Sequence, residues 1–232
     1  MISECIILAG GLGTRLRSVV NEVPKVMAPV NEQPFLYYLI KRLSEQNIQR
    51  IIFATGYKHE IIANWVQDTF PNSSFLFSIE EEPLGTGGAI RKAMEMADTE
   101  DVLVLNGDSY LEVDYNQLLD FHQHKKAEAT LVLKSMKNFD RYGCVETDNT
   151  GRITAFLEKE YRAEGLINAG VYLLNRTRFL SHAFPEKFSM EKEYLEENVH
   201  QLPLYGFTTE GYFIDIGIPE DFARAQIDFK NK

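Results

Sequence analysis

Short hydrophobic runs alternate with longer amphipathic segments over the first half of the chain. The runs are continuous and bounded by turn residues, which predicts parallel strands buried on both faces at residues 5–9, 51–54, 75–79 and 102–105. Between them, hydrophobic residues recur every three or four positions, which predicts helices at residues 34–47, 61–70 and 85–97. This alternation predicts an α/β fold with a Rossmann-like, mostly parallel sheet flanked by helices.

After Thr130 the pattern changes to strands separated by turns. The predicted strands are residues 130–134, 143–146, 153–158 and 167–174, with a hairpin turn at 148–151, so this half is expected to be a mixed or antiparallel sheet. A polar helix near residues 190–201, a strand at 212–216 and a closing helix from Pro219 to about Phe229 complete the prediction. Because no repeat or composition break marks a linker, we expect a single domain over residues 1–232.

Composition and charge narrow the class of protein. With 44% hydrophobic and 25% charged residues, the 232-residue chain has the balance of an ordinary globular protein. A net charge of −10 argues against a nucleic-acid partner, so any phosphate ligand must be held locally. The longest hydrophobic runs, such as residues 35–40, are far shorter than the roughly 20 residues that cross a bilayer, and no basic leader precedes them. We therefore expect no membrane partner.

The two cysteines, Cys5 and Cys144, lie in hydrophobic strand-like runs and match no metal or redox spacing. We expect both to be reduced core residues, as in a cytoplasmic protein.

A glycine-rich loop follows the first predicted strand, at residues 8–16 (LAGGLGTRL). Open α/β sheets bind ligands at this end of their strands. The glycines let the backbone approach phosphate oxygens, and Arg15 can make a bidentate contact, so the loop suits a nucleoside triphosphate. The alternative is a tight turn with a solvated arginine. Leu16 stands where a dinucleotide fingerprint has its third glycine, and no Gly-Lys-Ser/Thr of a P-loop occurs, so both of those motifs are excluded.

Two aspartates are candidate metal ligands. Asp108 follows the Asn-Gly that ends a hydrophobic strand, so its carboxylate is expected at the ligand-binding edge of the sheet. Asp215 lies between two isoleucines on a predicted strand, and a buried carboxylate needs a cation or hydrogen-bond donors nearby. The alternatives are a turn-forming aspartate at 108 and, at 215, an aspartate that accepts a backbone N–H.

Seven motifs together give the chain a resemblance to the sugar-1-phosphate nucleotidyltransferases, over nearly its whole length. They are the glycine loop, Pro24-Lys25, residues 82–89 (EPLGTGGA), Asn106-Gly107-Asp108, Glu158-Lys159, Asn168-Ala169-Gly170 and residues 214–217 (IDIG). Within that family, residues 24–30 (PKVMAPV), residues 34–36 and the short length are most similar to the D-glycero-α-D-manno-heptose 1-phosphate guanylyltransferases.

The resemblance implies a role for each motif residue. The nucleotide-binding residues would be Leu8, Gly10, Gly11, Gly13, Thr14, Arg15, Lys25, Glu81, Gly85, Thr86, Gly107 and Asp108. The sugar phosphate would bind in the mixed-sheet half, at Gly143, Glu158, Lys159 and Asn168. Mg²⁺ would be held by Asp108 and Asp215, and the catalytic set would be Arg15, Lys25, Asp108, Lys159 and Asp215.

Several of these positions keep an alternative interpretation. An isolated lysine is usually a surface residue, and an asparagine such as Asn168 at the start of a strand is also common in turns. Residues 80–82 could supply a carboxylate for the N1–H and 2-amino groups of guanine, or form only an acidic turn. Glu160 stands where many relatives have proline after Glu-Lys, which leaves the conformation of that loop open.

The expected chemistry needs no nucleophilic side chain. None of the five histidines lies beside a reactive serine or cysteine motif, and His122 and His124 are predicted at the surface of a helix that ends at Lys125-Lys126. A phosphomonoester has a second pKa of about 6, so its oxygen is mostly deprotonated at pH 7 and can attack without a general base. Catalysis then requires alignment and charge neutralisation.

The expected reaction is transfer of GMP from GTP to D-glycero-α-D-manno-heptose 1-phosphate. It would release pyrophosphate and form GDP-heptose for bacterial surface polysaccharide. Three alternatives remain. One is guanylyl transfer to mannose 1-phosphate, or uridylyl or cytidylyl transfer to another sugar phosphate. The second is a catalytically silent nucleotide-sugar-binding subunit, and the third, more remote, is a Rossmann oxidoreductase. Family members often self-associate, so a homo-oligomer is possible, although the sequence identifies no contact.

Overall fold

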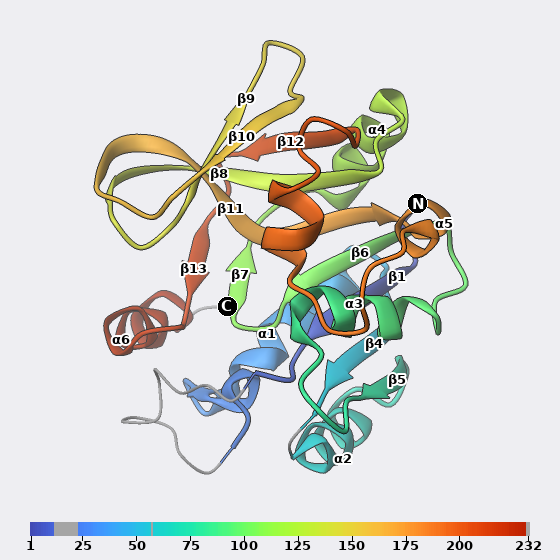
Figure 1. Ribbon diagram of the computed structural model, residues 1–232. Coiled ribbons are helices and arrows are strands. Elements are labelled where there is room, and N and C mark those ends of the chain that lie inside the picture. The colour runs from blue at the N-terminus through green and yellow to red at the C-terminus, as the bar shows by residue number, and fades with distance from the viewer. Residues whose placement is uncertain (12–22, 57, 231–232) are drawn as a thin grey trace.

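The computed structural model describes residues 1–11, 23–56 and 58–230, and a nine-stranded sheet runs through its centre (Figure 1). Four neighbouring strands are parallel, in the order β6, β1, β4 and β5. Their bounds are β1 (Glu4–Leu8), β4 (Arg50–Thr55), β5 (Ser74–Ile79) and β6 (Asp101–Asn106). The predicted parallel half is confirmed, with strand ends that differ by at most one residue.

Helices cover both faces of the parallel strands. These are α1 (Phe35–Glu45) and α2 (His59–Thr69) on one face and α3 (Gly85–Met94) on the other, whereas α4 (Tyr115–Lys125), α5 (Arg176–Ser181) and α6 (Pro219–Asp228) pack against the rest of the fold. Successive strand residues point to opposite faces, so Ile7 packs in one hydrophobic cluster with α1 and α2, while Ile6 packs in a second with α3. Pro34 is the N-cap residue of α1 and not, as was predicted, its first helical residue. Helix α3 ends three residues earlier than predicted.

The second half of the chain extends the same sheet with antiparallel pairs. Its strands are β8 (Ala129–Phe139), β9 (Cys144–Thr147), β10 (Ile153–Leu157), β11 (Arg162–Asn175) and β12 (Leu204–Thr209). The long strand β11 pairs antiparallel with β6, β8 and β9, whereas β12 is parallel to β8. The mixed sheet is therefore confirmed. Strand β12 was not predicted, because its sequence, LYGFTT, contains a glycine and neither a continuous hydrophobic run nor a hydrophobic–polar alternation.

Shorter elements complete the fold. Two are short antiparallel pairs, the hairpin of β2 (Pro29–Val30) with β3 (Gln33–Pro34) and the long-range pair of β7 (Ser109–Leu111) with β13 (Phe213–Asp215). A 3₁₀ turn, η2 (Lys25–Met27), precedes β2. The polar helix predicted near residues 190–201 is a seven-residue π-helix, η3 (Met190–Glu196), followed by turns.

The structure corrects the prediction for one histidine. His122 on α4 is only 2% exposed, and its Nδ1 atom lies 2.8 Å from the Thr130 hydroxyl. The prediction that it lies at the surface is therefore wrong, whereas His124 is exposed. The signal was present, because His122 follows the buried Leu118 and Leu119 at helical spacing.

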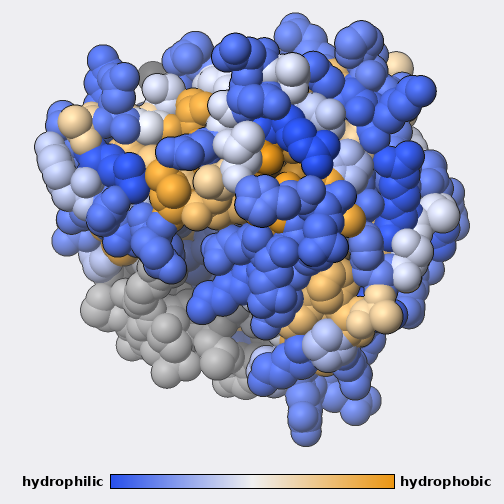
Figure 2. All heavy atoms as spheres, turned by 45° about the horizontal axis from the view of Figure 1, so that its top comes forward, coloured by the Kyte–Doolittle hydropathy of each residue, from blue (hydrophilic) through white to orange (hydrophobic). Residues whose placement is uncertain are grey.

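Three further expectations concern the cysteines, a membrane span and the molecular surface. Cys5 and Cys144 are buried and unpaired, as expected. Among the described residues, no helix combines the length and hydrophobicity that a membrane span requires. Figure 2 shows one face on which hydrophilic side chains predominate and hydrophobic ones gather in smaller areas between them. The single domain stays a prediction.

Candidate active site

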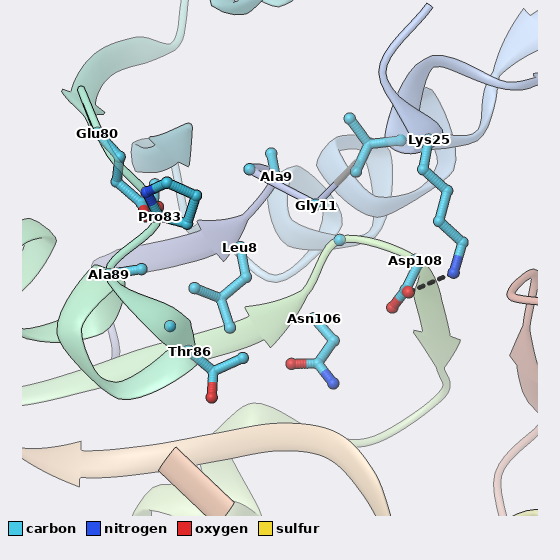
Figure 3. A pocket seen from close by; sticks show the side chains of 15 residues that line it. Leu8, Ala9, Gly11, Lys25, Glu80, Pro83, Thr86, Ala89, Asn106 and Asp108 are labelled. Atoms are coloured by element: carbon cyan, nitrogen blue, oxygen red, sulfur yellow. Dashed lines mark hydrogen bonds and ion pairs between the residues drawn. The ribbon is translucent and has the colours of Figure 1, made fainter. Parts of the chain in front are cut away.

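The sheet reverses its strand order between β1 and β6, and a cavity opens beside that point. From β1 the chain proceeds to β4 and β5 on one side, while β6 lies on the other. The two strand ends stay close, since the Gly107 N–H donates to the Leu8 carbonyl at 3.0 Å. In open α/β sheets, ligands bind outside the carboxyl ends of strands at such a reversal. The first cavity, of about 530 Å³, lies there (Figure 3).

Most of the predicted nucleotide-binding residues line this first cavity. They are Leu8, Gly10, Gly11, Lys25, Gly85, Thr86, Gly107 and Asp108. Gly13, Thr14 and Arg15 lie outside the described residues. We call this space the nucleotide cavity.

The acidic segment contributes a different residue from the one predicted. Glu81 is not among the residues that line the nucleotide cavity, whereas Glu80 is. The Glu80 carboxylate accepts the Leu84 N–H at 2.9 Å, and its other oxygen lies 3.1 Å from where a Cβ on Gly10 would be. Glu80 directly follows β5, so it lies at the same edge of the sheet as the other site residues. That position in the strand pattern was the signal that could have singled it out.

The two predicted metal ligands lie together around one lysine. Strand pairing sets Asp215 opposite Ser109, next to Asp108. The Lys25 ammonium lies 2.5 Å from Asp108 Oδ2 and 3.9 Å from Asp215 Oδ1, and Figure 3 shows the shorter of these two contacts. Asp215 also accepts the Gly217 N–H at 2.7 Å. The alternative interpretation of Asp215, an aspartate that accepts a backbone N–H, therefore holds as well. One cation can therefore contact both carboxylates.

A second cavity, of about 520 Å³, adjoins the first and is lined by all four predicted sugar-binding residues. Gly143, Glu158, Lys159 and Asn168 border it, together with Asp108 and Asp215. Asn106 and Asp108 line both cavities, so the two spaces meet at the end of β6. We call the second space the sugar cavity.

A bulge in β11 shapes the boundary between the cavities. The pairing of β11 with β8 shifts register between Asn168 and Tyr172, and Gly170 inside that shift has φ +73°. A Cβ on Gly170 would lie 2.6 Å from the Asn106 side-chain nitrogen, so only glycine allows this approach. The turn also orients Asn168, which accepts the Gly170 N–H and donates to the Tyr172 hydroxyl at 2.9 Å.

Comparison with known proteins identifies the family. Residues 4–232 match the family described as "Nucleotidyl transferase". The chain belongs to this family. It is 48% identical to the D-glycero-α-D-manno-heptose 1-phosphate guanylyltransferase of Aneurinibacillus thermoaerophilus, over 98% of this chain and 99% of that protein. The Campylobacter jejuni protein of the same name is 43% identical, over 94% and 96%.

Further relatives show where the similarity weakens. The mannose-1-phosphate guanylyltransferase of Mycobacterium tuberculosis is 34% identical over 97% of this chain, which covers only 64% of that longer protein. The crystal structure of HddC from Yersinia pseudotuberculosis complexed with GMP-PN superposes with a TM-score of 0.89 at 37% identity, covering 99% of this chain and 100% of that one. UDP-glucose pyrophosphorylase shares the fold, with a TM-score of 0.81 at 18% identity.

The sugar cavity of this nucleotidyl transferase is rich in carboxylates that the sequence did not single out. Glu191 and Glu196 from η3 line it beside Glu158, and Lys192 adds a positive charge. Burial and the nearby Glu158 raise the pKa of Glu196, and burial with the charge of Glu191 raises the pKa of Tyr172. Carboxylates and hydroxyls of this kind suit a polyhydroxylated ligand. The signal that could have found them was the polar face of a segment interpreted only as a helix.

The carboxylates of the site fit a magnesium ion whose remaining ligands come from the substrate. Asp108 and Asp215 supply two carboxylates, and in the described part of the chain no cluster of three or more His, Cys, Asp or Glu is placed to hold a metal. Mg²⁺ commonly binds one or two carboxylates and takes its remaining ligands from phosphate oxygens and water. A structural cage of protein ligands is not needed for that mode.

Proposed function

We propose that the protein transfers GMP from GTP to D-glycero-α-D-manno-heptose 1-phosphate, which releases pyrophosphate and forms GDP-heptose. The observation that carries this proposal is the pair of adjoining cavities that share Asn106 and Asp108. One is bordered by a glycine turn at the sheet edge, and the other is a polar space suited to a sugar. The near-full-length similarity to two proteins of that name supports the choice of substrates.

In the proposed reaction, an oxygen of the sugar phosphate attacks the α-phosphorus of the triphosphate. The new P–O bond forms as the bond to the β-phosphate oxygen breaks, and pyrophosphate leaves. The attacking oxygen is already deprotonated at neutral pH, so no side chain has to remove a proton. The protein's task is to bring two anions together, and two unit charges about 4 Å apart interact by about 4 kcal/mol at an effective dielectric near 20.

The two proposed phosphate-binding lysines lie in different cavities. Lys25 lines the nucleotide cavity, where it would contact the triphosphate, and Lys159 lines the sugar cavity, where it would contact the sugar phosphate. Arg15 is proposed for the triphosphate as well. Mg²⁺ held by Asp108 and Asp215 would supply charge neutralisation at the transferred phosphate. Glu80 is the proposed acceptor for guanine, because its carboxylate borders the nucleotide cavity.

The same proposal places the reaction in the cytoplasm. Nucleoside triphosphates are cytoplasmic metabolites, and two buried, unpaired cysteines suit a reducing compartment. Self-association stays a prediction.

A substrate screen tests the proposed function. Four nucleoside triphosphates are each combined with the heptose 1-phosphate, mannose 1-phosphate and other sugar 1-phosphates, and pyrophosphate release is measured. We expect GTP with the heptose 1-phosphate to give the highest kcat/KM. A site that pairs guanine's donors rejects other bases strongly, whereas the extra hydroxymethylene of heptose is worth only about 1–3 kcal/mol by shape. The base preference should therefore be sharper than the sugar preference.

Two results of the screen would count against this assignment. If UTP or CTP matches GTP at equal concentration, or if no heptose phosphate reacts, the guanylyltransferase assignment fails. Absence of pyrophosphate release with every pair would favour a silent nucleotide-sugar-binding subunit.

A second expectation concerns metal binding by the free protein. Because the Lys25 ammonium contacts both proposed metal ligands, a divalent cation has to displace it. We expect Lys25→Ala to bind Mn²⁺, without nucleotide, about 10-fold more tightly than the unmodified protein, since the hydrogen bond between the charged Lys25 and Asp108 that the cation must displace is worth about 1.5–3 kcal/mol. Electron paramagnetic resonance of free Mn²⁺ measures the dissociation constant. Unchanged or weaker Mn²⁺ binding would contradict the assignment of these carboxylates.

A further inference from the structure

Two segments that are far apart in the sequence are joined at the start of helix α3. The Phe188 carbonyl accepts the N–H groups of Gly87 at 3.0 Å and Gly88 at 3.3 Å, and the Phe188 N–H donates to the Leu84 carbonyl at 3.0 Å. N–H groups in the first turn of a helix have no partner within the helix. Here the segment before η3 supplies those partners, so the two segments form one hydrogen-bonded unit.

Side chains extend this connection. The Thr86 hydroxyl donates to Glu191 Oε2 at 2.7 Å and accepts the Met190 N–H at 2.9 Å. The Ser189 hydroxyl donates to the same Glu191 oxygen at 3.0 Å. A hydroxyl has a single proton, so each of these two hydroxyls directs its proton to Glu191. Hydrogen bonds to an ionised carboxylate are about twice as strong as neutral ones.

The two ends of this connection lie in different cavities. Thr86 lines the nucleotide cavity, whereas Ser189 and Glu191 line the sugar cavity. Figure 3 shows Thr86 on the helix that borders the nucleotide cavity, with its side chain pointing to the same side as that of Asn106. The Thr86–Glu191 hydrogen bond therefore joins the walls of the two substrate sites.

The η3 segment, which carries Glu191, is held in place by packing in the hydrophobic core. Met190, Tyr194 and Leu195 are fully buried in the second hydrophobic cluster. The Tyr194 hydroxyl also donates to the buried Glu128 carboxylate at 2.9 Å. Because interiors are closely packed, a displacement of α3 is passed to η3 and is not absorbed locally.

We propose that Glu191 is a positioning residue that couples the nucleotide and sugar cavities. A nucleotide held against Gly85 and Thr86 sets the start of α3, and the Thr86–Glu191 bond then sets the wall that contacts the sugar. Glu191 is not a phosphate ligand, because its negative charge would repel one. Coupling between two binding equilibria is reciprocal, so removing the bond must affect both substrates. This inference rests on the proposed function only in needing a nucleotide and a sugar phosphate as substrates.

Steady-state kinetics of variants at this bond test the proposal. KM is measured for GTP at saturating heptose 1-phosphate, and for the heptose 1-phosphate at saturating GTP. We expect Glu191→Ala to raise KM for GTP about 5-fold as well as KM for the sugar phosphate, and Thr86→Val to raise KM for the sugar phosphate about 5-fold. The double variant should raise each KM no further than the larger single effect, because both changes break one bond. In all three, kcat should change less than about 3-fold.

Two further variants separate coupling from general damage. Glu191→Gln keeps an oxygen that can accept both hydroxyl protons, so we expect it to recover most of the loss seen with alanine. Glu197→Ala removes a carboxylate just after η3 that does not line the sugar cavity, and both KM values should stay unchanged. Circular dichroism confirms folding, and if Glu191→Ala does not fold, Thr86→Val still measures the effect on the sugar site.

Separate outcomes decide the inference and the proposed function. The inference is overturned if Glu191→Ala changes only the KM for the sugar phosphate, if Thr86→Val changes only the KM for GTP, or if the two effects multiply in the double variant. If the unmodified protein does not use GTP with the heptose 1-phosphate, the proposed function fails, and the variants are measured with the pair that the substrate screen identifies.

Discussion

Replacing Asp108 with asparagine is expected to lower kcat by about 10²–10³-fold while the protein stays folded. The carboxylate lies where both cavities meet, so it would hold Mg²⁺ beside the phosphorus under attack. Asparagine keeps the shape and one oxygen but removes the negative charge. Loss of a group that stabilises charge in the transition state costs rates of this size. Pyrophosphate release over a range of Mg²⁺ concentrations measures the effect.

A second active-site variant and a control variant accompany this experiment. Asp215→Asn should lower kcat by a similar factor, since both carboxylates lie within reach of one cation. Asp120→Asn is the matched control, because Asp120 is exposed on α4 and lines neither cavity, and its turnover should be that of the unmodified protein. Turnover near the normal value at limiting Mg²⁺ in either active-site variant would remove that residue from the proposed metal site.

Lys159→Ala is expected to raise mainly the KM for the sugar phosphate, and Lys25→Ala mainly the KM for GTP. Lys159 borders the sugar cavity and not the nucleotide cavity, whereas the reverse holds for Lys25. A hydrogen bond to a charged group is worth about 1.5–3 kcal/mol, so each variant should raise KM for its own substrate by about 10–100-fold. The KM for the other substrate should change much less. Initial rates with each substrate varied at saturation of the other give the four values.

An exposed lysine elsewhere controls for the loss of positive charge. Lys137 on β8 lines neither cavity, so Lys137→Ala should leave both KM values unchanged. Equal effects of Lys25→Ala and Lys159→Ala on both substrates would refute the division of labour. That result would also resemble the pattern expected for Glu191→Ala, whose effect is meant to cross between the cavities.

Much of the architecture could be predicted from local pattern. The continuous hydrophobic runs that became β1, β4, β5 and β6 are typical of strands covered on both faces, and the structure confirms them as neighbouring parallel strands. Because loops at the carboxyl ends of such strands meet at one edge, the motifs around Gly10 and Asp108 could be assigned to one site. The family could also be recognised, because its motifs occur in order and in short segments.

Other features depended on contacts between distant residues. Glu80 rather than Glu81 borders the nucleotide cavity, since the end of β5 sets which side chain turns inward. The segment at η3 had the composition of a surface helix, but packing against α3 makes it a wall of the sugar cavity.

The sequence by itself determined the strands and helices of the parallel half and which short motifs lie at the sheet edge, because the spacing of hydrophobic and polar residues reports local burial. Only the tertiary structure decided that the Lys25 ammonium contacts both Asp108 and Asp215, and that Thr86 bonds to Glu191. The first arrangement depends on the pairing of β13 with β7. The second is a contact between residues that are 105 positions apart in the sequence. Such pairings are set by the packing of the whole chain, because many registers satisfy the same local pattern and only one fills the core.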